Sequence, residues 1–569
     1  MLQLAVYEVK DRSFLTLSSD VDEYFWMLRG QRMRRFRTYS SVGQAWLEAE
    51  KRNDSFVAGK LSGLLGHPVP SMQSTDQIDG WTNMKQKADS LGRILGGRSL
   101  LWEEICSLLQ GRWGGFTDEK ELRRLLQVLL LTRQARLLPG VYTPGPAVHR
   151  KCNRCGGGAE DLEVTPCARC GRFCVLCDRC ILLGKSRTCS GFFLFEPQKP
   201  FGTPDKKNVP FASVPLTSAQ RDASEASLRW LDQSGDRDLL VWAVTGSGKT
   251  EVLLPVVHRV LERGEKVFWS SPRTDVVREL SGRLKRAFPA TRLVALHKGS
   301  SQIWEEGDLF VGTAHQAFRL YHRFQLVIVD EADAYPLSAD TGLSLALKRA
   351  AAPEGMRVLL TATPPPSWQR RVQKGRLEAV TLPARYHGYP LPEPHLRRVW
   401  RMWRKVDAGR PIPPLDSFLI RMEEVDGQAL LFIPGVRDAD RLQRWMERRH
   451  PRLFRRVASV SGKDAERASQ VKAFREGRLQ ALITTTILER GVTVPRCHVA
   501  VLGADHPVFD GASLIQIAGR VGRSPEYRQG RVFFFASENT EGQRRALREI
   551  RKMNRLAVSG GYLKKEVGS

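Results

Sequence analysis

The sequence predicts an α/β protein with two parallel-sheet domains, preceded by a cysteine-rich module and a mixed, mainly helical N-terminal region. Three observations lead to this prediction. Short apolar runs alternate with helical patterns from about residue 215 onward, as in proteins whose parallel strands are joined by helices. A glycine-rich string at 243–251 joins one such run to a helix. Eight of the ten cysteines lie between Cys152 and Cys189.

The composition suits a soluble globular protein of several domains, with 569 residues of which 42% are hydrophobic and 26% charged. The formal net charge of +28 is unusual. Such an excess attracts polyanions, chiefly nucleic acid or an anionic membrane face, although solvated arginine-rich surfaces would give the same count. No apolar run reaches about 18 residues, and the first residues lack an export-signal pattern. We therefore expect neither a membrane-spanning helix nor an export signal.

Changes in composition divide the chain into five segments. Residues 1–145 mix helical patterns with turns and carry no catalytic motif, and we expect most of their tryptophans to pack rather than to stack on bases. The proline- and lysine-rich string Glu196–Thr217 indicates a linker. The expected segments are a variable N-terminal region (1–145), a cysteine module (146–195), the linker (196–214) and two parallel-sheet domains (215–384 and 385–569), the second beginning with a strand at Gln428–Pro434.

The string AVTGSGKTE at 243–251 indicates a nucleoside-triphosphate site. It follows the apolar run Leu239–Trp242 and precedes a helical pattern, an order that surrounds a phosphate with backbone N–H groups and the positive end of a helix. Lys249 is expected to reach the β- and γ-phosphates, and the Thr250 hydroxyl to bind Mg²⁺. A chance glycine-rich loop is the weaker alternative. The loop residues expected to bind ATP are Thr245, Gly246, Ser247, Gly248, Lys249 and Thr250.

The string QLVIVDEADAYP at 325–336 predicts a buried strand that ends in carboxylates. Asp330 is expected to hold Mg²⁺, and Glu331 to orient and polarise the attacking water. Hydrolysis needs both, because the metal neutralises phosphate charge and a positioned base selects the water. Acidic residues after a strand can also form a solvated turn, but the phosphate loop upstream makes that reading weaker.

Five further strings lie between and after these two, at 270–280, 311–318, 359–365, 483–495 and 516–524. The last, QIAGRVGRS, is the most specific. It places Arg520 and Arg523 about one helical turn apart, so both can face one cleft. An arginine that a second domain inserts at the γ-phosphate stabilises the charge of the transition state.

This order of strings resembles superfamily 2 DNA and RNA helicases, in which ATP binds between two RecA-like domains. The resemblance covers about 350 residues, from Leu216 to the end. It implies that Gln220 contacts adenine. It also implies that the nucleic acid is bound through phosphate and sugar by Arg273, Thr313, His315 and Thr486. The residues implied to couple the two domains are Asp333, Thr361, Thr363 and Gln516.

The cysteine spacing indicates zinc. C-x2-C pairs on glycine-rich turns suit tetrahedral Zn²⁺, because two such thiolates can bind one ion. Eight thiolates can hold two ions, and we favour an interleaved arrangement. A single ion is the alternative, and redox thiols or an iron–sulfur cluster are less favoured. No catalytic zinc is expected, since no histidine or carboxylate is patterned as a ligand. The first set is Cys152, Cys155, Cys177 and Cys180; the second, less certain, is Cys167, Cys170, Cys174 and Cys189.

A cysteine module directly before the motor resembles the ComFA family of competence proteins of Gram-positive bacteria. The strings CDRCILLGK, DEADAYP, HGYPLP, TTTILERGVTVP and LIQIAGRVGR carry this resemblance. It implies an ATPase stimulated by single-stranded DNA, which drives DNA into the cytoplasm at the inner face of the membrane during natural transformation. It implies ComFC and DprA as partners. A membrane-associated DNA-uptake channel and a further copy of the chain are two other candidate partners. Residues 1–145 depart from the family pattern and are expected to be an added, variable region without an assigned role. The second cysteine set exceeds the four-cysteine pattern of the family, so the expected number of metal ions is one or two.

Two other functions compete with this one. A replication-restart helicase resembling PriA shares TGSGKTE, but that family carries its zinc module inside the second motor domain. A zinc-containing DNA-binding scaffold with weak ATPase activity is the other. The intact Lys249, Glu331, Arg520 and Arg523 argue against a scaffold. ATP turnover with and without single-stranded DNA separates scaffold from motor.

Overall fold

The computed structural model describes residues 2–10, 12–53, 78–112, 118–144, 149–198, 208–233, 235, 237–425, 427–461, 467–488, 496–524, 527 and 530–564. The chain forms two compact units. One holds residues 1–211, 234–237 and 259–357, and the other holds residues 212–233, 238–258 and 358–569. Residues 199–207 of the predicted linker lie outside the described residues, as do Trp113 and residues 489–495.

The N-terminal region is mixed, as predicted. It begins with an antiparallel sheet in the order β2-β1-β3 (Arg12–Thr16, Leu4–Val9 and Arg34–Tyr39) with helices α1 (Ser19–Met27) and α2 (Val42–Asn53). Helices α3 (Ile78–Leu95) and α5 (Glu119–Leu131) add to the same apolar core, and Trp102 belongs to it. The buried Asp22 carboxylate accepts hydrogen bonds from the Tyr7 hydroxyl (2.5 Å), the Thr16 hydroxyl and the Gln127 amide (3.0 Å). Burial nevertheless raises the pKa of Asp22 to about 7.

A second antiparallel sheet joins distant parts of the chain in the order β4-β10-β5. Its centre is β10 (Gly191–Phe195), a fully buried GFFLF run that follows the cysteines. On one side β10 pairs with β4 (Ser99–Leu101), which precedes α4 (Trp102–Arg112), and on the other with β5 (Ala135–Pro139). The cysteine segment is therefore inserted between two neighbouring strands of this sheet.

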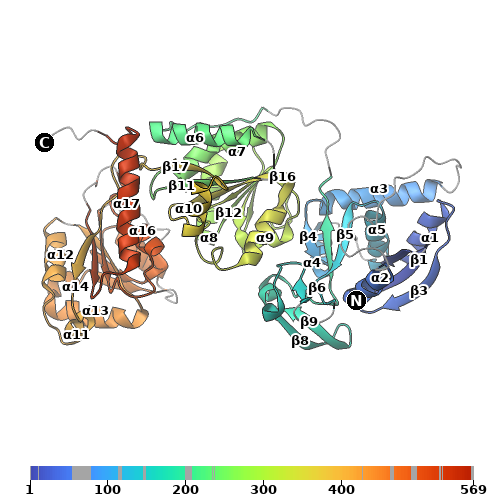
Figure 1. Cartoon of the computed structure of the whole chain (residues 1–569), viewed down its shortest axis with the longest axis horizontal. Helices are drawn as coiled ribbons and strands as arrows, with labels where there is room; N and C mark the ends of the chain where they lie inside the picture. The colour runs from blue at the N-terminus through green and yellow to red at the C-terminus, as the bar shows by residue number, and fades with distance from the viewer. Residues whose placement is uncertain are drawn as a thin grey trace. The chain divides into compact units, whose positions relative to one another are not determined.

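The cysteine segment is built from two short antiparallel pairs and 3-10 turns; strands β6, β8 and β9 are labelled in Figure 1. β6 (Val141–Tyr142) pairs with β7 (Lys151–Cys152), and β8 (Leu162–Cys167) forms a hairpin with β9 (Arg172–Cys177). Two 3-10 turns, η3 (Ala159–Asp161) and η4 (Asp178–Leu183), complete it. Because such short strands bury little apolar area, the segment depends on its cysteines for cohesion.

The first large sheet has seven strands, in the order β13-β14-β12-β15-β16-β11-β17. The pairs β11–β17, β12–β14, β12–β15 and β13–β14 are parallel. The strands are β11 (Asp238–Ala243), β12 (Val267–Ser271), β13 (Leu293–Leu296), β14 (Leu309–Thr313), β15 (Phe324–Val329), β16 (Ala351–Thr361) and β17 (Glu378–Leu382). The helices of this region are α6 (Ser218–Leu231), α7 (Lys249–Glu262), α8 (Thr274–Ala287), η5 (Ala314–Arg319), α9 (Thr341–Ala350) and α10 (Pro366–Gln373).

The second large sheet has six parallel strands, in the order β18-β23-β22-β19-β21-β20. The strands are β18 (His395–Arg398), β19 (Gln428–Phe432), β20 (Val457–Val460), β21 (Ala481–Thr484), β22 (Cys497–Leu502) and β23 (Val532–Ala536). The helices are α11 (Met402–Asp407), α12 (Pro413–Glu424), α13 (Val436–Arg449), α14 (Pro451–Phe454), α15 (Arg467–Arg475), η6 (Thr486–Leu488), α16 (Gly511–Ala518) and α17 (Glu541–Ser559).

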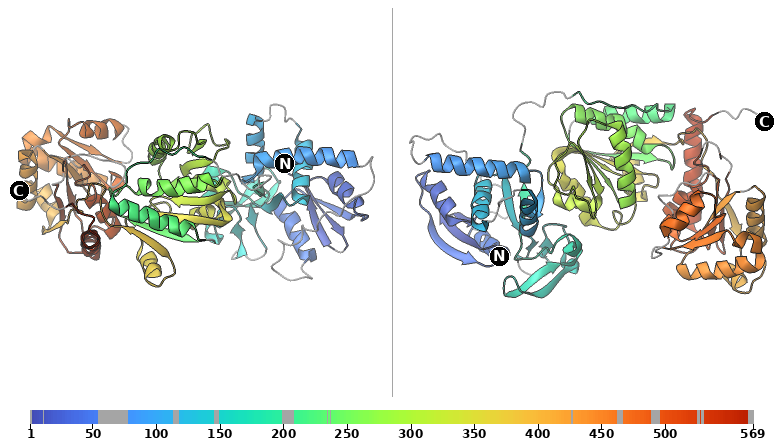
Figure 2. Two further views of the ribbon diagram at one scale, coloured as in Figure 1. Left: turned by 90° about the horizontal axis from the view of Figure 1, so that it is seen from above. Right: turned by 180° about the vertical axis from the view of Figure 1, so that it is seen from behind.

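Alternate residues of β19 show why this second sheet is covered on both faces. Leu430 and Phe432 belong to the apolar cluster with α16 and α17, whereas Ala429 and Leu431 belong to the cluster with α12 and α13. Figure 2 shows helices on both sides of the parallel sheets. The predicted fold class, two RecA-like parallel-sheet domains after a cysteine module and a mixed N-terminal region, is thus confirmed. The predicted first strand of the second domain is wrong, because the edge strand β18 precedes β19 in sequence.

Candidate ATP site and cysteine centres

The glycine-rich loop lies between the end of β11 and the start of α7, as its sequence predicted. Gly246 and Gly248 have φ values of 77° and 75°, which residues with a side chain rarely adopt. A Cβ at Gly248 would lie 2.2 Å from the Gln220 Nε2 atom. Both glycines are therefore required by this loop conformation. Lys249 and Thr250 form the first turn of α7, where the helix N-terminus favours an anion.

Gln220 contacts the loop directly. Its side chain and that of Thr217 form a capping box at the start of α6, in which the Gln220 Oε1 atom accepts a hydrogen bond from the Thr217 N–H (2.9 Å). The Gln220 Nε2 atom donates to the Ser247 carbonyl (2.8 Å). Gln220 is 4% exposed, so the capping box fixes a buried amide against the phosphate loop.

The predicted catalytic carboxylates lie directly after β15. Asp330 is buried; its N–H donates to the Ser270 carbonyl (2.8 Å), and its Oδ1 atom accepts from the Glu331 N–H (2.8 Å). Glu331 has a φ of 48°, a left-handed conformation that costs free energy in a non-glycine residue and occurs often at functional sites. Asp333 lies in the turns that follow.

The arginine-bearing loop follows α16, which ends at Ala518. Arg520 and Arg523 are therefore separated by a turn rather than by helix, and they differ in exposure: Arg520 is buried and Arg523 is half-buried. The loop contacts the phosphate loop, because the Thr245 hydroxyl donates to the Gly519 carbonyl (3.4 Å). A Cβ at Gly519 would lie 2.0 Å from the Thr245 Oγ1 atom, so this close approach requires glycine.

Sequence reasoning missed two residues of this region, Arg385 and His387. Both are buried, and both donate hydrogen bonds to carbonyls of the turn at residues 519–522. We call residues 519–523, which are this turn and Arg523, the arginine loop. The string HGYPLP, which carries part of the family resemblance, begins at His387 but indicates no role for either residue.

Three of the predicted coupling residues are in contact. The Thr363 N–H donates to the Thr361 hydroxyl oxygen (2.9 Å), and the Gln516 Nε2 atom donates to the Thr363 hydroxyl oxygen (3.4 Å). All three side chains are buried. The chain after β16 therefore touches α16 immediately before the arginine loop.

The residues predicted to contact nucleic acid follow the carboxyl ends of strands. Arg273 precedes α8 and pairs with Asp275 (2.9 Å), and Thr313 ends β14, whose neighbour in the sheet is β12. His315 lies in η5, where burial lowers its imidazole pKa. Thr486 lies in η6, after β21. The structure thus brings Thr313 and the strand before Arg273 to one sheet edge.

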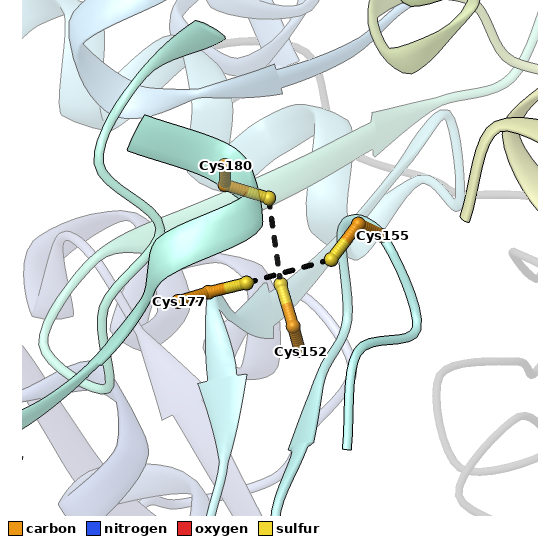
Figure 3. Close-up of side chains that lie close together, drawn as sticks. All are labelled: Cys152, Cys155, Cys177 and Cys180. Carbon is orange, nitrogen blue, oxygen red and sulfur yellow. Dashed lines mark hydrogen bonds between the residues drawn. The ribbon is translucent and has the colours of Figure 1, made fainter. Parts of the chain in front are cut away.

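The first cysteine set forms a compact buried cluster, in which Cys152, Cys155, Cys177 and Cys180 point toward a common centre (Figure 3). The Sγ atoms of Cys152 and Cys180 are 3.8 Å apart, and those of Cys155 and Cys177 are 3.5 Å apart. All four Sγ atoms lie within 4.8 Å of one another. Hydrogen bonds from neighbouring thiols, first that of Cys155, hold the pKa of Cys152 far below its usual range.

The second set, Cys167, Cys170, Cys174 and Cys189, lies at the tip of the β8–β9 hairpin and meets the same 4.8 Å limit. The Sγ atoms of Cys167 and Cys189 are 3.7 Å apart. The hydrogen bond from the Cys189 thiol lowers the pKa of Cys174 to about 5. The eight cysteines therefore gather in the interleaved sets that their spacing predicted. Four thiolates without an open position fit a structural Zn²⁺ ion rather than a catalytic one.

Ion pairs that the sequence did not predict connect the cysteine segment to α4 and to the helices that accompany the first large sheet. Arg154, between Cys152 and Cys155, is fully buried and donates to both oxygens of Glu104 (2.8 and 3.0 Å). The Glu104 carboxylate also accepts from Arg319 Nε (2.8 Å), at the end of η5. We call these three residues the Glu104 junction.

Two further contacts support the same attachment. Arg179, between Cys177 and Cys180, pairs with Asp340, whose carboxylate caps α9. The Arg349 Nη1 atom donates to the Asn153 carbonyl (3.1 Å). Both loops of the first cysteine set therefore contact the motor. Among the helices that the structure describes, none is both long and apolar enough to cross a membrane.

Three known families match this sequence. Competence protein ComFA N-terminal domain matches residues 83–194, DEAD/DEAH box helicase matches 217–372, and Helicase conserved C-terminal domain matches 413–525. The first match runs from α3 to β10 and so includes both β10 and the strands that flank it. The two helicase matches place the protein in the class of helicase-like ATPases.

Known proteins of similar sequence show to which family of helicase-like ATPases the chain belongs. Competence protein ComFA of Bacillus subtilis (strain 168) is 36% identical over 416 residues, which cover 72% of this chain and 86% of that protein. Competence protein ComFA of Streptococcus pneumoniae (strain ATCC BAA-255 / R6) is 36% identical over 383 residues, covering 67% and 86%. Replication restart protein PriA of Bacillus subtilis (strain 168) is 29% identical over 203 residues, covering 33% and 25%. The PriA likeness leaves most of both chains unmatched, whereas the ComFA likeness covers 72% or 67% of this chain and 86% of each ComFA protein. This chain belongs to the ComFA family of competence proteins and is an ATP-driven, DNA-processing motor.

Proposed function

We propose that this protein hydrolyses ATP to move along single-stranded DNA and thereby draws incoming DNA into the cytoplasm during natural transformation. The observation that carries the proposal is the contact between the phosphate loop and the arginine loop, within a chain of the ComFA family. In a motor, ATP binding and hydrolysis must change the arrangement of two domains. A contact between the phosphate loop and the arginine loop is one way to couple the bound nucleotide to both domains.

The proposed hydrolysis uses residues of both motor domains. Lys249 and the loop N–H groups bind the phosphates, and Gln220 orients the adenine side of the site. Thr250 and Asp330 would hold Mg²⁺, which neutralises phosphate charge. Glu331 orients the attacking water and accepts its proton. Arg520 and Arg523 stabilise charge on the transferring phosphoryl group.

The proposed movement follows from domain closure on ATP and opening after hydrolysis. Gln516 and Thr363 already touch, so the pair can relay the state of the nucleotide between the domains. Asp333 and Thr361 take part in the same relay. Arg273, Thr313, His315 and Thr486 would bind the strand through phosphate and sugar, which gives affinity without sequence choice.

The proposed cofactors and partners extend this picture. Both cysteine sets would hold structural Zn²⁺, because each offers four converging thiols. By family resemblance, ComFC and DprA would be partners, and the protein would act at the inner face of the membrane. A membrane-associated DNA-uptake channel and a second copy of the chain are further proposed partners. The charge of +28 supports contact with DNA and with an anionic membrane.

The test compares ATP turnover with single-stranded DNA, duplex DNA and RNA at several salt concentrations. We expect the largest stimulation with single-stranded DNA, little sequence preference and a linear fall of log affinity with log salt. Lys249→Ala should abolish turnover, while Lys374→Ala, which removes an exposed lysine of the same charge, should not. Equal stimulation by all three nucleic acids, or none, would overturn the proposal.

A further inference from the structure

The buried guanidinium of Arg385 binds the backbone of the arginine loop. The Arg385 Nη1 atom donates to the carbonyls of Val521 and Gly522, both at 2.7 Å, and its Nη2 atom donates to the Gly519 carbonyl (3.4 Å). Arg385 is only 3% exposed. One side chain therefore binds three carbonyl groups of a four-residue turn, which restricts that turn more than any single contact could.

The carbonyls that Arg385 binds lie at and just after the end of a helix. Gly519 caps the C-terminus of α16, and Val521 and Gly522 follow it, so the guanidinium lies where the helix dipole favours a cation. Arg385 also lies beside a second cation, Arg523. Burial, and then repulsion from Arg523, lower the pKa of Arg385 to about 9, which leaves the guanidinium protonated at pH 7. Two cations beside the phosphate loop favour a bound polyanion.

The neighbours of Arg385 connect the same turn to the phosphate loop. The Tyr386 N–H donates to the Gly246 carbonyl (3.1 Å). The His387 Nε2 atom donates to the Gly522 carbonyl (2.9 Å), and its Nδ1 atom accepts from the Tyr389 N–H (3.2 Å), which assigns the ring proton to Nε2. Residues 385–387 therefore hold the arginine loop on one side and the phosphate loop on the other.

We propose that Arg385 is a positioning residue for ATP hydrolysis, which fixes the 519–522 turn so that Arg523 is presented to the γ-phosphate. This inference rests on the role proposed above for Arg523. It predicts that Arg385 acts on the transition state through the arginine loop and contributes little to ground-state binding of ATP.

The test is a double-mutant cycle on the full-length protein, with kcat and KM for ATP measured per nucleotide-binding site after titration with a fluorescent ADP. Arginine fingers contribute about 10³–10⁵-fold to turnover, so loss of positioning in Arg385→Gln should lower kcat by about tenfold or more. KM should change by less than about threefold. Arg385→Lys, which keeps the charge but not the fork, should recover part of kcat and covers the case in which the glutamine variant does not fold.

The cycle separates the two proposals. If Arg523→Ala does not lower kcat, the role of Arg523 in the proposed function fails. If Arg523→Ala lowers kcat but adds its full loss in the Arg385→Gln background, the two act independently and the positioning inference fails. Arg323→Gln, which removes another buried guanidinium, should leave kcat per binding site unchanged. If Arg323→Gln lowers kcat as much as Arg385→Gln does, the effect of Arg385 is a general effect of removing a buried arginine, and the inference is overturned.

Discussion

Glu104→Ala should loosen the attachment of the first cysteine set far more than loss of an exposed ion pair would. The carboxylate accepts four hydrogen bonds: two from Arg154, one from Arg319 and one from the Leu101 N–H (3.0 Å). The Glu104 side chain is 11% exposed and that of Arg154 is 0% exposed. After the substitution, Arg154 would keep only carbonyl partners, the nearer being Leu183 at 3.2 Å.

The magnitude follows from this burial. Removing one partner of a buried pair costs about 3–5 kcal/mol, because the other charge remains buried without a counter-charge. Arg154→Ala should cost less, about 1–3 kcal/mol, since Glu104 would still bind Arg319 and the Leu101 N–H. The expected order, Glu104→Ala worse than Arg154→Ala, is a direct consequence of the geometry.

Amide hydrogen exchange measures this locally, which a chain of several domains requires. At about 1.4 kcal/mol per tenfold, peptides covering residues 102–110, 151–156 and 314–320 should exchange about 10²–10³·⁵-fold faster in Glu104→Ala. The control is Lys87→Ala, which removes an ion pair with 57% and 43% exposed side chains and should cost less than about 1 kcal/mol. Acceleration no greater than in the control, or a larger effect of Arg154→Ala, would refute the reasoning.

Three further predictions concern the ATP site, the second cysteine set and the N-terminal core. Glu331→Gln should still bind ATP but release phosphate about 10²–10⁴-fold more slowly, and turnover at the parent rate would contradict the assignment. Metal analysis should find two zinc ions per chain and one in Cys174→Ser; iron, or a single ion in the parent, would contradict two zinc sites. Because burial raises the pKa of Asp22 to about 7, above its unfolded value near 4, its stabilising contribution is complete below about pH 4 and is lost as the pH rises through 7. Exchange of α1 amides should therefore be faster at pH 8 than at pH 5 after correction for intrinsic rates, and Asp22→Asn should remove that difference.

The sequence predicted those parts of the site that local patterns encode. A strand, a glycine-rich loop and a helix follow one another within about 25 residues, and C-x2-C pairs fix their own geometry. Both patterns carry a physical requirement at short range, such as the positive φ of Gly246 and Gly248. They could be read without knowing where the rest of the chain lies.

The residues that escaped prediction act across long separations. Arg385 binds carbonyls 134 to 137 positions away, and Arg319 reaches Glu104 across 215 positions. Backbone carbonyls have no sequence signature, and a buried arginine looks like any other among 89 lysines and arginines. The strand β10 was also absent from the predicted scheme, because GFFLF alone does not say which strands it will join.

The position of β10 has a consequence for how the protein is made. Strands β4 and β5 emerge from the ribosome long before β10, yet β10 is the strand that joins them. The β4-β10-β5 sheet therefore stays incomplete during synthesis until all eight cysteines of the module have been translated. Such non-local pairing is slow and leaves strand edges exposed in the meantime. Metal capture by the nascent module, by drawing residue 191 toward residue 139, would shorten that exposed interval. Zinc supply would then influence how much folded protein the cell obtains, separately from any effect on the finished motor.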